Sequence, residues 1–360
     1  MTCFGDHRSI LSSMDEYGRL ADFITGYRIF LITTATITTA IYVFLLILIF
    51  LKTPTVMEKY VKYNLINITT STWMQLVVVA VWQPIPLFNF KAGFSAGPIQ
   101  YIPLPYITES MSLLMLALMF NLSLALLISF IHQYSTLRPH STIGKIFDKN
   151  YRACGLYILY SVIIYFLLAM LIFSMHIPSQ EFENQVKSDF NGTTNSSGYT
   201  QNQLELLLLV YKNQPTLSKY SIASIDSKIY LVLVIIIITS VATMTAWIIG
   251  KIMRKIYSIC PLTQHPVTNH LHSMVFRTLC LSSLTFLLFF IVPGIIMPLG
   301  AIGLFPTCYP VMVMYLLIAL QAPAILINVL VTIRPYRRCV VRMISKMTTI
   351  LQKERTSNSN

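Results

Sequence analysis

The chain has 360 residues, of which 55% are apolar and 11% are charged, and its formal net charge is +13. Soluble globular proteins carry roughly 25% charged residues, so this composition excludes an ordinary soluble domain. A helix of about 20 apolar residues spans the hydrocarbon core of a bilayer, and seven stretches of 21 or more residues contain no charged side chain. In chain order they are 29–51, 64–84, 111–131, 155–177, 229–250, 278–299 and 309–333.

These stretches predict an all-α membrane protein, a seven-transmembrane helix bundle. Lipid offers backbone groups no partners, so membrane spans are helices or closed barrels, and continuous apolar runs favour helices over the alternating pattern of barrel strands. The predicted parts are an extracellular tail (1–28), a transmembrane domain (29–333) and a basic cytoplasmic tail (334–360). The spans are expected at about 29–51, 64–84, 109–131, 155–177, 229–250, 274–299 and 309–333.

The distribution of charge predicts the orientation. If the N-terminus is outside, the cytoplasmic segments are 52–63, 132–154, 251–277 and 334–360, which hold 18 of the 26 Lys and Arg residues but three of the 13 acids. This positive-inside bias predicts an extracellular N-terminus and a cytoplasmic C-terminus. The basic surplus is then explained by topology and by anionic inner-leaflet lipid, and nucleic acid is not needed to explain it.

Several residues on the predicted outer side carry modification signals. Asn191 and Asn195 lie in sequons within the long segment 178–228, so we expect N-glycosylation there. Cys3 and Cys308 are the cysteines on this side, and they either form a disulfide or stay as two free thiols.

Two prolines are candidate hinges. Pro293 lies in the outer third of the sixth span and Pro323 near the middle of the seventh. Each removes a backbone hydrogen bond and permits a kink. Each is read either as a bend about which the inner half of a helix moves or as ordinary tolerance of proline in membrane helices.

The spans lack the groups that most membrane chemistry needs. Pumps and proton-coupled transporters use intramembrane acids or arginines, and hydrolases use a nucleophile–base pair or a metal. The spans show neither pattern, so we expect no enzyme, no cofactor and no metal site. Neutral polar residues are left, and Asn67, Asn121 and Asn328 are expected to hydrogen-bond across helices.

Two groups of residues are candidates for binding. Near the outer ends of the spans, an apolar cavity with few polar anchors would suit a small, largely neutral molecule. Its candidate residues, each of which is otherwise ordinary core, are Trp82, Gln83, Glu109, Met111, Met115, Tyr315 and Gln321. On the cytoplasmic side, basic residues reflect topology and lipid headgroups or, as an added hypothesis, a partner with an acidic surface. Its candidate residues are His132, Gln133, Arg138, Arg254, Lys255, Arg334, Tyr336 and Arg337.

The layout resembles a G-protein-coupled receptor, although it departs from the rhodopsin-like pattern. The third span ends Phe130-Ile-His-Gln-Tyr with no acid–Arg pair, and the seventh span lacks Asn-Pro-x-x-Tyr. Three segments resemble nematode chemoreceptors of the Str superfamily, classes Srh and Sri. They are Lys52-Thr-Pro-Thr-Val-Met, Trp82-Gln-Pro-Ile-Pro-Leu-Phe with Ala92-Gly, and Arg334-Pro-Tyr-Arg, and the Gln-Pro-x-Pro-Leu run with the His-Gln pair favours Sri.

This resemblance implies a receptor for odorant-like environmental chemicals in the plasma membrane of sensory cilia. It also implies a heterotrimeric G protein as the partner on the cytoplasmic side. The alternatives are a ligand-gated channel or transporter, which would give ligand-evoked current or flux without G-protein signalling, and an orphan membrane scaffold.

Overall fold

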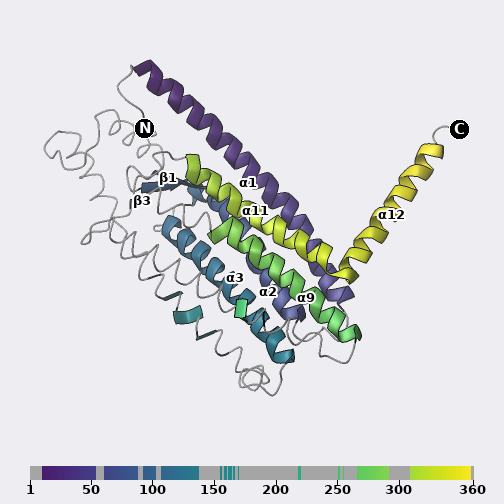
Figure 1. The fold of residues 1–360 in the computed structure, drawn as a ribbon. Coiled ribbons are helices and arrows are strands. Elements are labelled where there is room, and N and C mark those ends of the chain that lie inside the picture. Colours follow the sequence, from purple (N-terminus) through teal and green to yellow (C-terminus); the bar gives the residue numbers. More distant parts are fainter. Residues whose placement is uncertain are drawn as a thin grey trace.

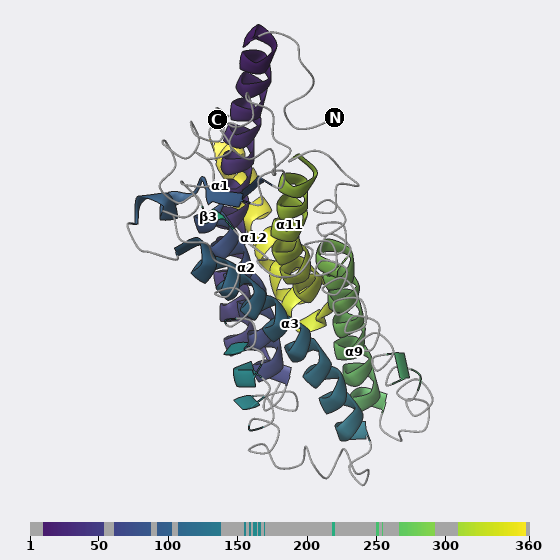
Figure 2. The ribbon, with the colours of Figure 1, turned by 90° about the vertical axis from the view of Figure 1, so that its left-hand side faces the viewer.

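A computed structural model describes residues 10–53, 61–87, 92–102, 107–137, 218–219, 266–291 and 309–357, with isolated positions between 155 and 169 and at 250, 251 and 254. Except for the last helix, the long helices of the described chain lie side by side along a common direction (Figure 1), and a view at right angles shows the same alignment (Figure 2). Nine positions of the predicted span 155–177 are described, and all nine are helical, whereas only residue 250 of the predicted span 229–250 is described.

The described helices follow the charge-free stretches. They are α1 (Ile10–Lys52), α2 (Val61–Trp82), α3 (Ile107–Leu137), α9 (Pro266–Phe286), α11 (Tyr309–Thr332) and α12 (Arg334–Ser357), with a π-helical segment, η5 (Leu287–Ile291), continuing α9. Within the described residues, four are long and apolar enough to cross a bilayer, over Asp22–Lys52, Lys62–Trp82, Ser110–Ser135 and Met312–Thr332. The all-α membrane bundle is thereby confirmed, while its orientation stays a prediction.

Two helices reach into segments that the sequence placed outside the spans. α1 begins at Ile10, inside the predicted tail 1–28, and α12 occupies most of the predicted tail 334–360. α12 leaves the bundle at the end where α11 stops and points away from it (Figure 1). The transmembrane bounds given above stay predictions, because a helix continues past the membrane wherever its sequence supports it.

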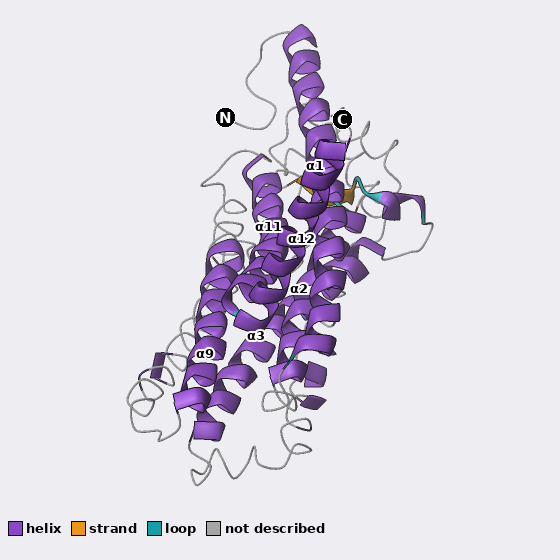
Figure 3. Ribbon diagram, turned by 90° about the vertical axis from the view of Figure 1, so that its right-hand side faces the viewer, coloured by secondary structure: helices purple, strands orange, loops and turns teal. Residues whose placement is uncertain are grey.

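A small sheet lies at the opposite end of the bundle (Figure 3). Strand β1 (Pro84–Leu87) pairs antiparallel with β2 (Ala92–Ser95), so that Pro84 faces Ser95 and Leu87 faces Ala92. Strand β3 (Ser218–Lys219) pairs with β2 and gives the order β1-β2-β3. β3 comes from segment 178–228, so the first and second predicted outer loops share one sheet.

Two apolar clusters fill the bundle. The outer cluster, near the sheet, is centred on Leu31, Val79, Met115, Met312 and Ala319. The inner cluster, at the other end, is centred on Leu45, Ile68, Leu122, Ile325 and Tyr336. Both draw residues from α1, α2, α3 and α11, which pack against one another, and α9 adds residues to the inner cluster. The names outer and inner follow the predicted orientation.

Asparagines connect the helices beside the inner cluster, as the sequence predicted. The Asn121 amide nitrogen on α3 donates to the Ser71 hydroxyl on α2 at 2.5 Å and to the Asn67 amide oxygen at 3.5 Å. The Asn328 amide nitrogen on α11 donates to the Ser282 hydroxyl on α9 at 3.0 Å. Hydrogen bonds of this kind contribute about 0.6–2 kcal/mol each to membrane helix association.

Candidate functional site

The outer end of α2 is closed by Gln83, a predicted ligand residue. Its φ of 48° places it in the left-handed region, which costs a non-glycine residue about 1–2 kcal/mol. Its backbone N–H donates to the Val79 carbonyl at 2.8 Å, the bond of an αL helix cap. Its side-chain nitrogen donates to the Ala80 carbonyl at 2.9 Å. Gln83 thus satisfies the last carbonyls of α2 and turns the chain into β1.

The hairpin folds back onto this cap through main-chain contacts. The Ala96 N–H donates to the Gln83 carbonyl at 3.1 Å, and the Gly97 N–H donates to the Trp82 carbonyl at 3.3 Å. A Cβ at Gly97 would lie 2.1 Å from the Val81 carbonyl oxygen. The close approach therefore requires glycine at position 97, where φ is an ordinary −82°.

Side chains from α1 and β2 strengthen the same junction. The Tyr27 hydroxyl of α1 donates to the Pro84 carbonyl at 3.3 Å, and the Ser95 hydroxyl donates to the Trp82 carbonyl. Sequence reasoning missed Tyr27, Ser95 and Gly97 because nothing in the loop composition shows which residues meet the end of α2.

The outer cluster brings several predicted ligand residues together. The rings of Trp82 and Tyr315 meet edge to face, with centroids 6.2 Å apart. Met115 lies in the same cluster, and Met111 packs against it. Glu109 is in the first turn of α3, and its side chain lies outside the described structure. The buried residues in the described part of the chain include no charged side chain, which favours an uncharged guest over an ion.

Several buried polar atoms of the bundle have no hydrogen-bond partner. Within the described part of the chain they are Thr38 Oγ1, Gln75 Nε2, Trp82 Nε1, Gln83 Oε1, Ser283 Oγ, Gln321 Nε2 and Gln321 Oε1. Such a group costs about 1–3 kcal/mol, and native structures hold few of them. Trp82, Gln83 and Gln321 were predicted ligand residues. Gln75 was missed, although an amide in an uncharged span was the available signal.

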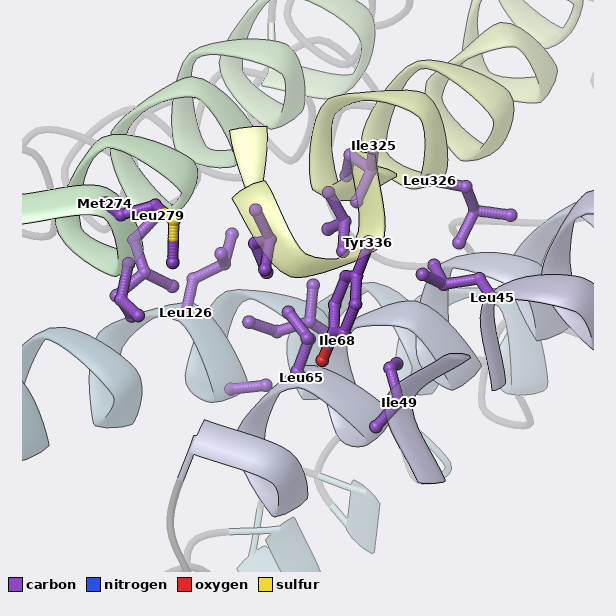
Figure 4. Packing of buried hydrophobic residues seen from close by; sticks show 14 of the residues in the cluster. Leu45, Ile49, Leu65, Ile68, Leu126, Met274, Leu279, Ile325, Leu326 and Tyr336 are labelled. Carbon is purple, nitrogen blue, oxygen red and sulfur yellow. The ribbon is translucent and has the colours of Figure 1, made fainter. Parts of the chain in front are cut away.

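The inner end of the bundle is closed by Tyr336, which was predicted to face a cytosolic partner. Its side chain is 1% exposed, and its hydroxyl lies 2.7 Å from the Thr53 hydroxyl at the end of α1. Figure 4 shows the ring pointing between Ile49 and Ile68. Burial raises the pKa of the Tyr336 phenol, and the bond to Thr53 offsets part of that rise. In this conformation the side chain fills the core and is not available to a partner.

The other residues predicted to face a cytosolic partner differ in solvent exposure. Arg254, Arg334 and Arg337 are exposed, whereas His132 is half-buried and Gln133 is buried. The remaining sequence candidates outside the described residues are Arg138, Lys255, Pro293, Cys3, Cys308, Asn191 and Asn195.

The inner half of α9 is attached to its neighbours at separate points. Phe276 meets Phe130 of α3 edge to face, with centroids 6.1 Å apart. The Arg334 N–H, at the start of α12, donates to the Met274 sulfur at 3.2 Å. Pro323 lies within α11, which continues through it as one helix. These contacts hold the inner ends of α3, α9 and α11 close together.

The described residues contain no group of three or more His, Cys, Asp or Glu side chains that could hold a metal ion. The model of a receptor family, the serpentine type 7TM GPCR chemoreceptor Srh, matches residues 23–346. The chain belongs to the Srh family. A comparison with curated proteins finds no match. Membership confirms the predicted superfamily and a chemoreceptor of the G-protein-coupled type, whereas the preference for the Sri class is not confirmed.

Proposed function

We propose that this Srh receptor binds a small, largely neutral environmental chemical among its outer helices and activates a heterotrimeric G protein. The observation that carries the proposal is the outer cluster, which contains aromatic and methionine side chains and the unpaired Trp82 indole N–H, in a described core without buried charged residues. Ligand pockets are commonly apolar with a few fixed polar groups. The family membership supports the same conclusion.

The predicted response is a shift between two arrangements of the helices. A ligand that binds one arrangement better than the other raises its population. The inner end of α9 is the moving part in this proposal. Its contacts through Phe276, Met274 and the hydrogen bonds of Asn328 are uncharged, so the arrangement can change without separating buried ion pairs. The exposed Arg254, Arg334 and Arg337 would then meet the acidic surface of the partner.

The test is guanine-nucleotide exchange by purified receptor in nanodiscs with a panel of heterotrimeric G proteins. We expect at least one G protein to bind GTPγS faster with receptor than without it. A mixture of volatile and water-soluble compounds should raise the rate further. If no G protein responds to folded receptor, with or without the compounds, the proposed coupling is wrong.

Two further measurements separate the alternatives. Because coupling between sites is reciprocal, bound G protein should raise the affinity for any compound that activates exchange. Ligand-evoked current or flux in liposomes that hold the receptor alone would instead favour a channel or transporter. Tagged receptor at the ciliary membrane of sensory neurons would agree with the proposed location, and retention in internal membranes would contradict it.

A further inference from the structure

The Gln321 side chain is the most incompletely satisfied polar group in the described core. It is 1% exposed, yet neither its amide nitrogen nor its amide oxygen has a hydrogen-bond partner. The other amide on α11, Asn328, has partners for both atoms, because Asn328 donates to α9 and accepts from Thr332. An amide buried without partners in a helix that elsewhere satisfies its polar groups indicates a missing polar guest.

The position of Gln321 shows which part of the bundle it meets. Gln321 lies two helical turns before Asn328, so both amides lie on the same face of α11. The Asn328 amide bonds Thr278 and Ser282 of α9, so this face is the one packed against α9.

Helix α9 changes its winding along the surface that contacts α11. Beyond Phe286 it continues as the π-helical segment η5, and η5 packs against α11. π-Helical turns inside α-helices occur frequently at functional sites. Ser283, one turn before η5, has a hydroxyl oxygen without a partner. The wider turn and the unpaired hydroxyl are observations independent of the Gln321 amide, and they indicate the same region.

A second unpaired amide comes from α2. Gln75 is 3% exposed and its amide nitrogen has no partner. Its neighbour Leu76 belongs to the outer cluster together with Ala319 and Ala322, which flank Gln321 on α11. Gln75 lies one turn after Ser71, whose hydroxyl accepts from the Asn121 amide of α3, so Gln75 lies on the face of α2 toward α3. Because α3 also packs against α9, the faces that carry Gln75 and Gln321 both turn toward the α3–α9 side of the bundle, and this is where we place the polar group that meets both amides.

We infer that Gln321 and Gln75 form a deep polar anchor for the ligand, and that the ligand carries an uncharged hydrogen-bonding head on an apolar body. The two amide nitrogens require an acceptor on the ligand, and the Gln321 amide oxygen requires a donor. A primary amide or an alcohol supplies both. A carboxylate or an ammonium group is disfavoured, because the buried residues in the described part of the chain include no charged side chain that would compensate it. The apolar body then lies toward Met115 and Tyr315.

The inference rests on the proposed ligand binding, but its test does not require G-protein coupling. Purified receptor is heated with six-carbon probes at equal concentrations, and the unfolding temperature is recorded. The probes are hexanamide and 1-hexanol, with hexane, hexanoate and hexylammonium as comparisons. We expect hexanamide and 1-hexanol to raise the unfolding temperature by a few degrees in a dose-dependent way. Hexane, hexanoate and hexylammonium should need at least tenfold higher concentrations for the same increase. The idea is overturned if the charged probes act equally, or if neither neutral polar probe acts.

Variants test the anchor directly. Gln321→Leu and Gln75→Leu should move the hexanamide dose curve at least tenfold to higher concentration. Without probe, Gln321→Leu should unfold at or above the wild-type temperature, because it removes an unpaired amide of similar volume. The matched control Asn328→Leu should unfold at a lower temperature, because its amide is paired. The anchor would be refuted if Gln321→Leu left the hexanamide dose curve unchanged. It would also be refuted if Gln321→Leu lost as much stability as Asn328→Leu.

The results also separate this inference from the proposed function. Probe binding without nucleotide exchange would leave the anchor standing and refute the coupling. Nucleotide exchange without stabilisation by hexanamide or hexanol would support the coupling and refute the anchor. If Gln321→Leu fails to fold, the wild-type probe series and Gln75→Leu still decide the question.

Discussion

Replacing Gly97 by alanine tests how tightly the outer hairpin is seated on α2. The added Cβ would lie 2.1 Å from the Val81 carbonyl oxygen, 2.8 Å from the Val81 carbonyl carbon and 2.9 Å from the Trp82 carbonyl carbon. All three are backbone atoms at the end of a helix, so no side-chain rotation relieves the contact. The hairpin has to recede by roughly 1 Å before the distances become ordinary for a methyl group.

The cost follows from that displacement. Overpacking in a tight site typically costs about 1–3 kcal/mol. The same movement stretches the hydrogen bonds from Gly97 to Trp82 and from Ala96 to Gln83, each worth about 0.5–1.5 kcal/mol. Together these terms predict that Gly97→Ala lowers the free energy of unfolding by about 2–6 kcal/mol.

The matched control is Gly26→Ala. Gly26 lies in α1, and a Cβ added there would have no atom within 4 Å. Alanine is favoured over glycine in a helix by about 0.5–1 kcal/mol. Thermal unfolding of purified receptor, followed by circular dichroism, should therefore show a loss of several degrees for position 97 and no loss for position 26. Equal unfolding temperatures for Gly97→Ala and wild type would show that the close approach is not present in the molecule.

Three further substitutions address other contacts. Asn121→Leu removes the bond to Ser71 and should lower the free energy of unfolding by about 0.5–2 kcal/mol; a denaturation curve identical to wild type would contradict this. Gln83→Val keeps the left-handed backbone, which a β-branched residue tolerates less well than glutamine, and loses the side-chain bond to the Ala80 carbonyl, so it should cost at least about 0.5–1.5 kcal/mol; equal destabilisation by Gln83→Gly would mean that the side chain, not the backbone, matters. Burial raises the pKa of Tyr336, so stability that is fully present below about pH 10 should fall as the pH rises toward that higher pKa. Tyr336→Phe should lose about 1 kcal/mol at neutral pH through the lost bond to Thr53 and should show a smaller alkaline decline than wild type, and an unchanged decline in the variant would show that other groups cause it.

The helices were predictable because lipid permits few backbone solutions for a long uncharged stretch. Stretch 309–333 corresponds to α11 at Tyr309–Thr332, and stretch 64–84 to α2 at Val61–Trp82. The pairing of asparagines across helices was also predictable, because an amide in an apolar span finds partners mainly on a neighbouring helix.

The tails and loops were not predicted in detail, for different reasons. α12 had a readable signal, since its apolar residues Tyr336, Val340, Met343 and Met347 recur every three or four positions. The sheet had none, because β3 is two residues long and pairs with a strand more than 100 positions earlier. Likewise, the burial of Tyr336 depends on a hydroxyl at the far end of α1, which local sequence does not reveal.

The hairpin at the end of α2 also bears on how such receptors diverge. Its bonds to α2 run largely between main-chain atoms, from Ala96 to Gln83 and from Gly97 to Trp82. Main-chain bonds do not depend on which side chain a residue carries. Mutation can therefore change side chains near the outer end of the bundle while the hairpin stays bonded to the end of α2, provided that position 97 stays glycine. Duplicated copies of such a gene would be free to acquire new ligand preferences while the backbone at this end of the bundle stays the same.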